Sequence, residues 1–425
     1  MSRLPVPLTV IQALPPSTPL DRNQPPTQLI DSFGRVIRDL RLSITDRCNF
    51  RCVYCMDPDV TFAPRDELLT IDEHLDIARV AVRLGVTKVR ITGGEPALHP
   101  GLIDLIRGLA GFNVDGSLDI AITTNGSFLD ASTAGRWREA GLTRVTLSLD
   151  SLRQDRFAAI TRSNATVDDV LAGIEAAKNA GLDPVRVNAV IVRGVNEDEL
   201  VDLAQLARRL AIDVRLIEYM PLDSAHAWER TKVVPATEML ERIGSVYPLT
   251  PIGRDTTSSP ATVFRFSDQP ANSSGRIGII ASVTRSFCST CSRLRITADG
   301  KVRPCLFAHD EWDIRPLLRT PSDSGALSVP SPVADGGGAE RSEAEGVLFP
   351  PPRAGEVPSL RGGGGLPSVP NAHRNGTHDS HAPDPSRDAA IARFLADAVY
   401  AKTAGHIIDS PDFRQPARTM SAIGG

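Results

Sequence analysis

The sequence lacks the features that would assign it at once to several common classes. It has no run of about 18 or more apolar residues, so we expect no membrane-spanning helix and no membrane partner. It has no excess of positive charge, since the net charge is -4, which argues against a protein that coats nucleic acid. Its six cysteines are too few for a disulfide scaffold. The proline-broken start also lacks the apolar run of a signal peptide, so we expect a cytoplasmic protein.

Proline and glycine are concentrated in two segments. Residues 1–30 carry seven prolines and are expected to form a disordered leader. Residues 321–385 hold 11 of the 33 glycines and 11 of the 33 prolines, a composition that buries too little apolar surface to offset the entropy of ordering. We therefore predict a disordered insert over 321–386, followed by a helix and a Gly-Gly tail over 387–425.

Elsewhere, short β-branched runs alternate with helical patterns, which is typical of βα units in an α/β fold. Helices are expected at 71–84, where Thr70 and Glu73 match a capping box, and at 167–180. Six units predict a partial (β/α)6 barrel of the TIM type over 31–233, followed by a smaller C-terminal region over 234–320. A doubly wound sheet is the alternative, although no GxGxxG pattern follows the first strand. The candidate strands are 40–45, 88–92, 119–124, 144–149, 185–192 and 213–219.

The cysteines form two groups of three, with none left over. A closed structural zinc site needs four ligands, and each group offers only three. A [4Fe-4S] cluster can instead take three thiolates and keep one iron open for another ligand. Reduced buried cysteines, or a zinc ribbon built across the two groups, are the alternatives. The first trio is Cys48, Cys52 and Cys55, in a CxxxCxxC pattern, and the second trio is Cys288, Cys291 and Cys305.

The first trio, placed after the first strand of a partial barrel, resembles the cluster motif of the radical S-adenosylmethionine (SAM) superfamily. The segments RITGGEP and FCSTCSRLRITADGKVRPCLF, with the terminal Gly424-Gly425, are similar to those of the GTP 3',8-cyclase family, which begins molybdenum cofactor biosynthesis. This resemblance covers about residues 32–307 and 388–425 and is absent from the leader and the insert. It implies two [4Fe-4S] clusters and SAM as cofactors.

By this resemblance, a 5'-deoxyadenosyl radical made from SAM removes hydrogen from C3' of GTP, and the C3' radical attacks C8 to give 3',8-cyclo-7,8-dihydro-GTP. The first trio would hold the cluster that cleaves SAM, and the second trio a cluster that binds the guanine. No side chain is implied as a catalytic acid or base. The residues implied for SAM are Tyr54, Gly94, Ser148 and Met220, and those implied for GTP are Arg41, Arg90, Thr123, Arg186, Arg293 and Arg295.

Four positions need separate comment. Arg186 stands where the family usually has lysine, so a planar fork replaces a point charge and the contact with GTP can be re-aimed. Arg215 is a further active-site candidate, and Gly424 and Gly425 are expected to enter the active site. Each doubling of a loop's length adds only about 0.6 kcal/mol to the entropic cost of closing the loop. We therefore expect activity to survive the insert.

Two other functions stay open at this stage. A radical SAM peptide-modifying enzyme with an auxiliary cluster usually carries more C-terminal cysteines than this chain has. A non-catalytic iron-sulfur or GTP sensor would not consume SAM. For the cyclase interpretation, the expected partners are GTP, an electron donor and cyclic pyranopterin monophosphate synthase, which would receive the product. A homodimer is one candidate assembly.

Overall fold

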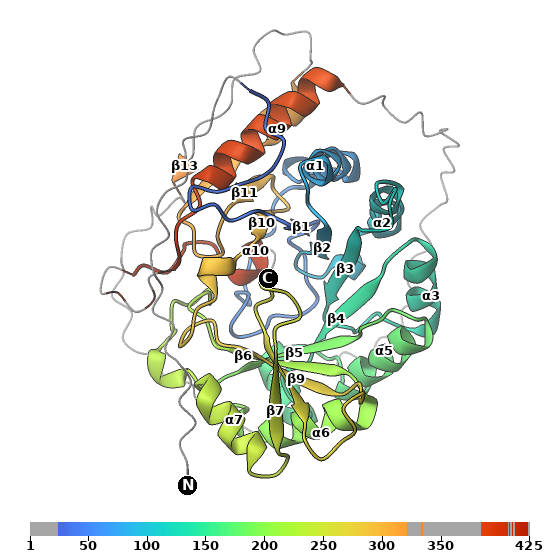
Figure 1. Cartoon of the computed structure of the whole chain (residues 1–425), viewed down its shortest axis with the longest axis vertical. Coiled ribbons are helices and arrows are strands. Elements are labelled where there is room, and N and C mark those ends of the chain that lie inside the picture. Colours follow the sequence, from blue (N-terminus) through green and yellow to red (C-terminus); the bar gives the residue numbers. More distant parts are fainter. Residues whose placement is uncertain are drawn as a thin grey trace.

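The fold is described here from a computed structural model of the chain (Figure 1). The structure describes residues 24–320, 333–334, 384–406, 408, 410 and 413–423. Most of the predicted leader and insert, and both Gly424 and Gly425, lie outside the described residues. Residues 24–30 belong to the fold and not to the leader, because Leu29 is fully buried and Ile30 forms a β-bridge with Val36.

Six parallel strands form the predicted α/β barrel. They pair in chain order, and each of their ends lies within two residues of the predicted position. Val, Ile and Leu dominate them because both faces of a parallel sheet are covered. The strands are β1 (Asp39–Ser43), β2 (Lys88–Thr92), β3 (Asp119–Thr124), β4 (Arg144–Ser148), β5 (Arg186–Ile191) and β6 (Asp213–Glu218).

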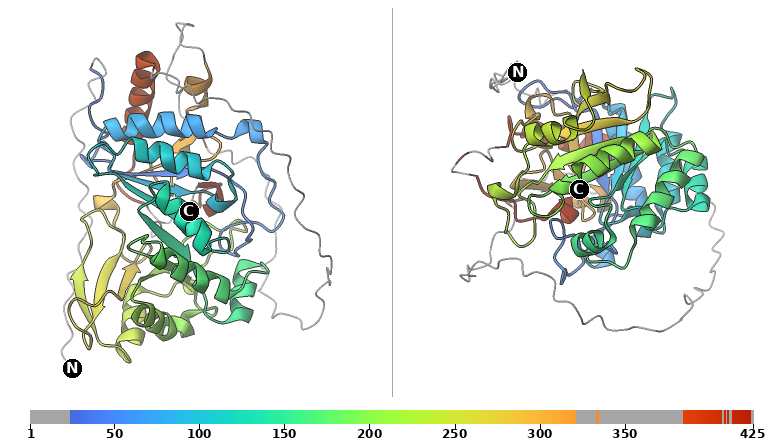
Figure 2. Two further views of the ribbon diagram at one scale, coloured as in Figure 1. Left: turned by 90° about the vertical axis from the view of Figure 1, so that its right-hand side faces the viewer. Right: turned by 90° about the horizontal axis from the view of Figure 1, so that it is seen from below.

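Helices cover the outer face of this curved sheet (Figure 2). Thr70 and Glu73 form the predicted capping box at the start of the first helix, and Thr166 and Asp169 form another at the fifth. Both helices therefore begin where their sequence patterns begin. The helices are α1 (Ile71–Arg83), α2 (Leu102–Gly111), α3 (Ala131–Glu139), α4 (Gln154–Thr161), α5 (Val167–Asn179), α6 (Leu200–Leu210) and α7 (Ala236–Gly244).

The C-terminal region supplies both edges of the barrel and does not form a separate sheet. Strand β9 (Arg276–Ile280) pairs in parallel with β6, and β10 (Arg293–Ile296) pairs in parallel with β1. Antiparallel strands continue the sheet on either side, so that its order in the described residues is β13-β12-β11-β10-β1-β2-β3-β4-β5-β6-β9-β8-β7. The barrel is therefore open, as a partial barrel should be. The added strands are β7 (Leu249–Gly253), β8 (Thr262–Phe266), β11 (Lys301–Arg303), β12 (Asp310–Asp313) and β13 (Val333–Ala334), the last of which falls within the predicted insert.

After the insert, the chain returns to the barrel. Helix α9 (Pro385–Tyr400) lies beside α1 (Figure 1). Its Asp388 accepts hydrogen bonds from Arg79 and, at 2.6 Å, from Arg83. The remaining helices are α8 (Arg315–Arg319), α10 (Met420–Ile423) and the 3-10 helices η1 (Arg65–Glu67), η2 (Pro96–Leu98), η3 (Glu197–Glu199), η4 (Arg230–Lys232) and η5 (Cys288–Thr290).

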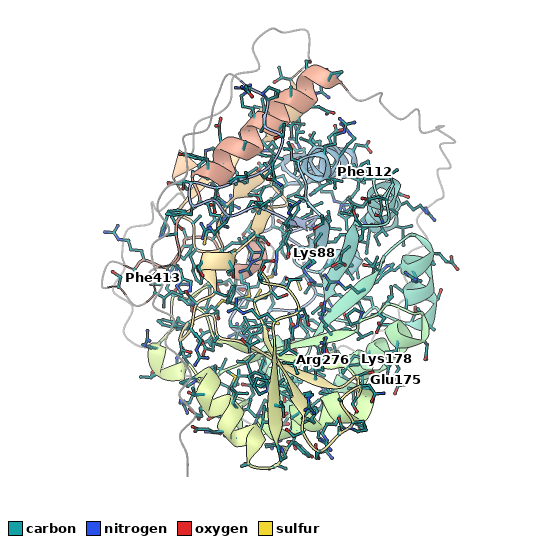
Figure 3. All side chains as sticks on the ribbon, in the orientation of Figure 1. Lys88, Phe112, Glu175, Lys178, Arg276 and Phe413 are labelled. Carbon is teal, nitrogen blue, oxygen red and sulfur yellow. The ribbon has the colours of Figure 1, made fainter. Side chains whose placement is uncertain are left out.

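Apolar side chains fill the space between the sheet and its helices (Figure 3). Leu40, Ile91, Phe157 and Phe394 are among the largest fully buried ones, and they come from strands and helices on both sides of the insert. The C-terminal helix thus shares one core with the barrel. None of the helices in the described part of the chain has the length and apolar content that a bilayer crossing requires.

Candidate functional site

One cavity brings together nearly all the residues singled out from the sequence. It lies at the carboxyl ends of the barrel strands, where loops of a βα barrel are expected to converge. Both cysteine trios face it, so two motifs more than 200 positions apart share one site. Its lining includes Cys48, Cys52, Cys55, Cys288, Cys291, Cys305, Tyr54, Gly94, Ser148, Met220, Arg41, Arg90, Thr123, Arg215, Arg293 and Arg295.

The first trio sits on a loop held by backbone hydrogen bonds. The amide of Cys55 donates to the carbonyl of Cys52 at 2.9 Å, and the amide of Val53 donates to Ile160 at the end of α4 at 3.0 Å. Burial raises the pKa of Cys48 to about 11 and that of Cys55 to about 12. Thiols in such a place keep their protons until a bound cation displaces them and stabilises the thiolates, so the donor set fits a metal cluster.

Tyr54, within the first trio motif, is fixed by a buried carboxylate. Its hydroxyl donates to Asp150 at 2.5 Å, and the amide of Val190 donates to the other oxygen of Asp150 at 2.8 Å. Burial raises the pKa of Asp150 to about 6. The side chain that follows β4 therefore orients a ring that lines the cavity.

Gly94 allows two backbone segments to meet beside the first trio. A Cβ at this position would lie 2.3 Å from the carbonyl oxygen of Arg47, which no side chain tolerates. The amide of Gly94 donates to Thr45 at 2.7 Å. The next residue, Glu95, is buried and accepts hydrogen bonds from Thr124 and from the amide of Asn125, each at 2.7 Å. The missing side chain at Gly94 thus lets the chain after β2 pack directly against the loop that leads to Cys48.

Three arginines, two of them buried and Arg41 half-buried, lie in register across three adjacent strands. Arg41 on β1 is opposite Arg295 on β10 and Arg90 on β2. Burial and mutual repulsion lower the pKa of Arg41 and of Arg90 to about 9, and that of Arg295 to about 10. Within the described residues, Nε of Arg293 and Nη1 of Arg295 are buried without a hydrogen-bond partner. So concentrated a positive charge, with donors unpaired, suits an anion.

Of the two other residues implied for GTP, Thr123 lines the cavity beside the arginine row and Arg186 does not. Thr123 accepts a hydrogen bond from Arg90 at 3.1 Å and lines the cavity. Arg186 is not among the lining residues, because its guanidinium lies 3.2 Å from Asp255 and 3.5 Å from Asp213. Arg215 does line the cavity, and it lies 3.4 Å from the same Asp255. The predicted contact of Arg186 with GTP stays a prediction.

The second trio is assembled from three elements on the opposite wall. Cys288 opens η5, Cys291 precedes β10 and Cys305 follows β11. Burial opposes ionisation of Cys291, but the charges of Arg293 and Lys402 outweigh it and lower its pKa to about 5. In the described part of the chain, no three His, Cys, Asp or Glu side chains converge as a site for a single metal ion. A four-iron cluster is larger than one ion, so its thiolates stand further apart.

Sequence reasoning missed several residues of this cavity. Lys402 and His406 follow α9, and Met420 and Ser421 belong to α10, yet all four line the site. Lys402 contacts a carbonyl 98 positions earlier in the chain. No local spacing links residues across an insert, so the sequence carried no signal for them beyond the expectation that the C-terminus approaches the site.

The chain is similar to proteins of known classes. Residues 42–207 match the Radical SAM superfamily model, and residues 212–329 match the Molybdenum Cofactor Synthesis C model. It is 38% identical over 399 residues to the GTP 3',8-cyclase of Mycolicibacterium smegmatis, covering 93% of this chain and 92% of that protein. It is 45% identical over 304 residues to the GTP 3',8-cyclase of Acidothermus cellulolyticus, covering 70% and 82%. Among solved structures, Streptococcus suis SuiB gives a TM-score of 0.47 at 15% identity, covering 63% of this chain and 60% of that one.

Proposed function

Because this chain belongs to the GTP 3',8-cyclase family of the radical SAM superfamily, we propose that its cavity binds SAM and GTP together, between the two cysteine trios. The reaction turns GTP into (8S)-3',8-cyclo-7,8-dihydroguanosine 5'-triphosphate and begins molybdenum cofactor biosynthesis. When bound, the [4Fe-4S] cluster and SAM supply the 5'-deoxyadenosyl radical that takes hydrogen from C3' of the ribose. The observation that carries this proposal is the single cavity that both trios and the arginine row share.

The SAM site lies beside the first trio. Cys48, Cys52 and Cys55 would hold the cluster, whose open iron leaves room for a ligand from SAM. We assign Gly94 and Tyr54 to SAM, because both line the cavity: Gly94 keeps the chain after β2 packed against the loop that leads to Cys48, and Asp150 orients the Tyr54 ring. We assign Ser148 and Met220, at the ends of β4 and β6, as further contacts of SAM.

The triphosphate of GTP fits the arginine row. GTP carries about four negative charges, and planar guanidinium forks match phosphate oxygens. Arg41, Arg90 and Arg295 lie side by side on neighbouring strands, and Arg293 adds a fourth cation beside Cys291. Thr123 keeps Arg90 in place, while Arg215 offers a further cation along the cavity wall. Bound phosphate would offset the repulsion that lowers the pKa values of these arginines.

The second trio would hold a second [4Fe-4S] cluster whose open iron binds the guanine. The second trio offers three thiolates, one fewer than a closed zinc site needs, and it lines the same cavity as the first trio, which supports this assignment. Cys288→Ala should keep SAM binding at the first trio and abolish cyclisation. Formation of cyclic product at the wild-type rate by this variant would contradict the assignment.

The reaction also implies an electron donor, an enzyme that takes up the product, and a compartment. The cluster needs an electron donor, and the product needs an enzyme that converts it onward, for which cyclic pyranopterin monophosphate synthase is our candidate. We place the protein in the cytoplasm, where reduced cysteines persist. We also propose that Gly424 and Gly425 enter the active site, because the preceding α10 already lines the cavity.

One anaerobic experiment tests the whole proposal. The protein is reconstituted with iron and sulfide, given reductant, SAM and GTP, and assayed by mass-resolved chromatography. We expect 5'-deoxyadenosine to accumulate while GTP becomes an isomer of unchanged mass. A Cys52→Ala variant, which lacks one ligand of the first trio, should produce neither. Deoxyadenosine formation with GTP left unchanged would show that the substrate is wrong.

A further inference from the structure

The segment that follows α9 packs directly against the second trio. Lys402 is only 3% exposed, although lysine is rarely buried without a partner. Its ammonium donates to the carbonyl of Arg293 at 2.9 Å and to the carbonyl of Pro304. Arg293 lies two positions after Cys291, and Pro304 directly precedes Cys305. One buried cation therefore ties together the two chain segments that carry two of the three cysteines.

The same segment also contacts the third cysteine. A Cβ at Gly405 would lie 3.1 Å from Cβ of Cys288 and 3.6 Å from its sulfur, so the backbone approaches this residue as closely as a glycine permits. The backbone N–H of His406 donates a hydrogen bond to the Cys288 thiol. Lys402 and His406 both line the cavity. Residues 402–406 thus contact all three positions of the second trio, directly or through the adjoining backbone.

Arg35 fixes this segment from its outer side. Its guanidinium donates to the carbonyls of Thr403 at 2.6 Å and Ala404 at 2.8 Å, and also to Cys288 at 2.7 Å. Asp31 accepts from Nε of Arg35 at 2.5 Å and aims the guanidinium. Segment 402–406 is therefore held between the N-terminal turn and the second trio.

We propose that Lys402 is a positioning residue of the second trio, which sets the geometry of its cysteine segments and places a positive charge beside the cluster bound there. The inference rests on the proposed function, because it takes the second trio to be a cluster site. A cluster held by three thiolates brings negative charge into a buried wall, and a lysine ammonium offsets part of it. Neighbouring groups that orient metal ligands in this way commonly control both occupancy and redox potential.

Two substitutions separate this role from simple packing. Lys402→Met keeps the apolar reach of the side chain but removes its charge and its donors, whereas Lys402→Arg keeps both. The full chain is reconstituted anaerobically, and iron and sulfide per chain are measured together with electron paramagnetic resonance (EPR) spectra of the reduced protein. We expect Lys402→Met to lose the second cluster, so that iron per chain falls toward half, while SAM still perturbs the signal of the first cluster. Lys402→Arg should keep most of the iron and most of the EPR signal of the second cluster.

Where the second cluster does assemble in Lys402→Met, its midpoint potential should be lower than in the wild type. The lost positive charge favours the reduced cluster, so its removal makes reduction harder. Gly405→Ala is a second probe, which should alter the EPR signal of the second cluster without changing that of the first.

Lys178→Met is the matched control. Lys178 (Figure 3) is exposed on α5 and donates to the carbonyl of Leu210 at 2.5 Å, so it too bonds a backbone oxygen, but it does not line the cavity. This variant should keep both clusters. A Lys402→Met protein with both clusters and an unchanged midpoint potential of the second cluster would overturn the role of Lys402 but leave the proposed second site standing. A wild-type protein that binds a single cluster would overturn the proposed second site itself.

Discussion

Arg418 lies against Asp299, with 2.9 Å between Nη2 and Oδ2, and so joins the C-terminal segment to the turn between β10 and β11. The same nitrogen donates to Glu311 on β12 at 2.8 Å. Burial opposes ionisation of Asp299, but the charge and hydrogen bonds of Arg418 hold the pKa of that carboxyl below its usual value. The pair therefore stays ionised at neutral pH. Two and three residues further on, Met420 and Ser421 line the cavity.

Arg418→Gln should loosen the docking of the C-terminal segment. It removes the ion pair of Asp299 with Arg418 and one of the two arginines that bond Glu311, the other being Arg303. A hydrogen bond to a charged group contributes about 1.5–3 kcal/mol, so we expect at least about a tenfold loss of kcat. Cluster content should stay unchanged, because the cysteines are untouched. Turnover and iron per chain are measured on the same preparation. Arg414→Gln, on an exposed residue of the same segment, is the control and should match the wild type.

Removing the hydroxyl of Tyr54 should weaken SAM binding. Tyr54→Phe leaves the buried Asp150 without a donor on one oxygen, and a lost bond to a charged group predicts about a tenfold weaker affinity. The SAM-dependent change in the EPR signal of the first cluster measures this affinity. Tyr247→Phe, whose ring packs edge-on against Phe266, removes a hydroxyl outside the cavity and should have no effect. Equal affinities in both variants would show that the Tyr54–Asp150 bond does not shape the SAM pocket.

We expect Asp255 to compete with bound GTP for Arg215, which lines the cavity, and to hold Arg186 outside it. Its carboxylate lies 3.2 Å from Arg186 and 3.4 Å from Arg215. Asp255→Asn should therefore lower the KM for GTP by about two- to fivefold, the range expected for a partly exposed ion pair, and leave kcat unchanged. Steady-state kinetics at two salt concentrations measure this. Asp268→Asn, which disrupts the pair of Asp268 with Arg208, is the control. A higher KM in Asp255→Asn would mean that the carboxylate orients the arginines and does not compete for them.

The sequence predicts the barrel and the grouping of the first cysteine trio well because their signals are local. The β-branched runs mark the strands, and CxxxCxxC places three thiols on one loop. The family resemblance implies Arg41, Arg90 and Arg295 for GTP, but their side-by-side arrangement could not be predicted, because it depends on the pairing of β10 with β1, which sets Arg295 beside Arg41 across most of the chain. The family resemblance implies Arg186 for GTP, but the carboxylate of Asp255 that holds it comes from the β7–β8 connection. Long-range pairing and side-chain orientation leave no trace in local spacing.

Deleting most of the insert should leave turnover intact. Arg387 at the start of α9 donates to the carbonyl of Thr320 at 3.3 Å, so the described residues on either side of the insert already touch. A short Gly-Ser linker can therefore replace 323–382 without moving α9 from α1, and each halving of loop length changes the closure cost by only about 0.6 kcal/mol. The deletion removes β13, a two-residue strand that pairs with β12 at one edge of the sheet as described. Cyclisation rate and iron content are compared with the full chain. Lys402 and Arg418 both lie after the insert; Lys402 bonds the backbone next to the second trio, and Arg418 bonds Asp299 in the turn between β10 and β11. A deletion variant that kept both clusters but lost activity would therefore show that the insert itself contributes to the site.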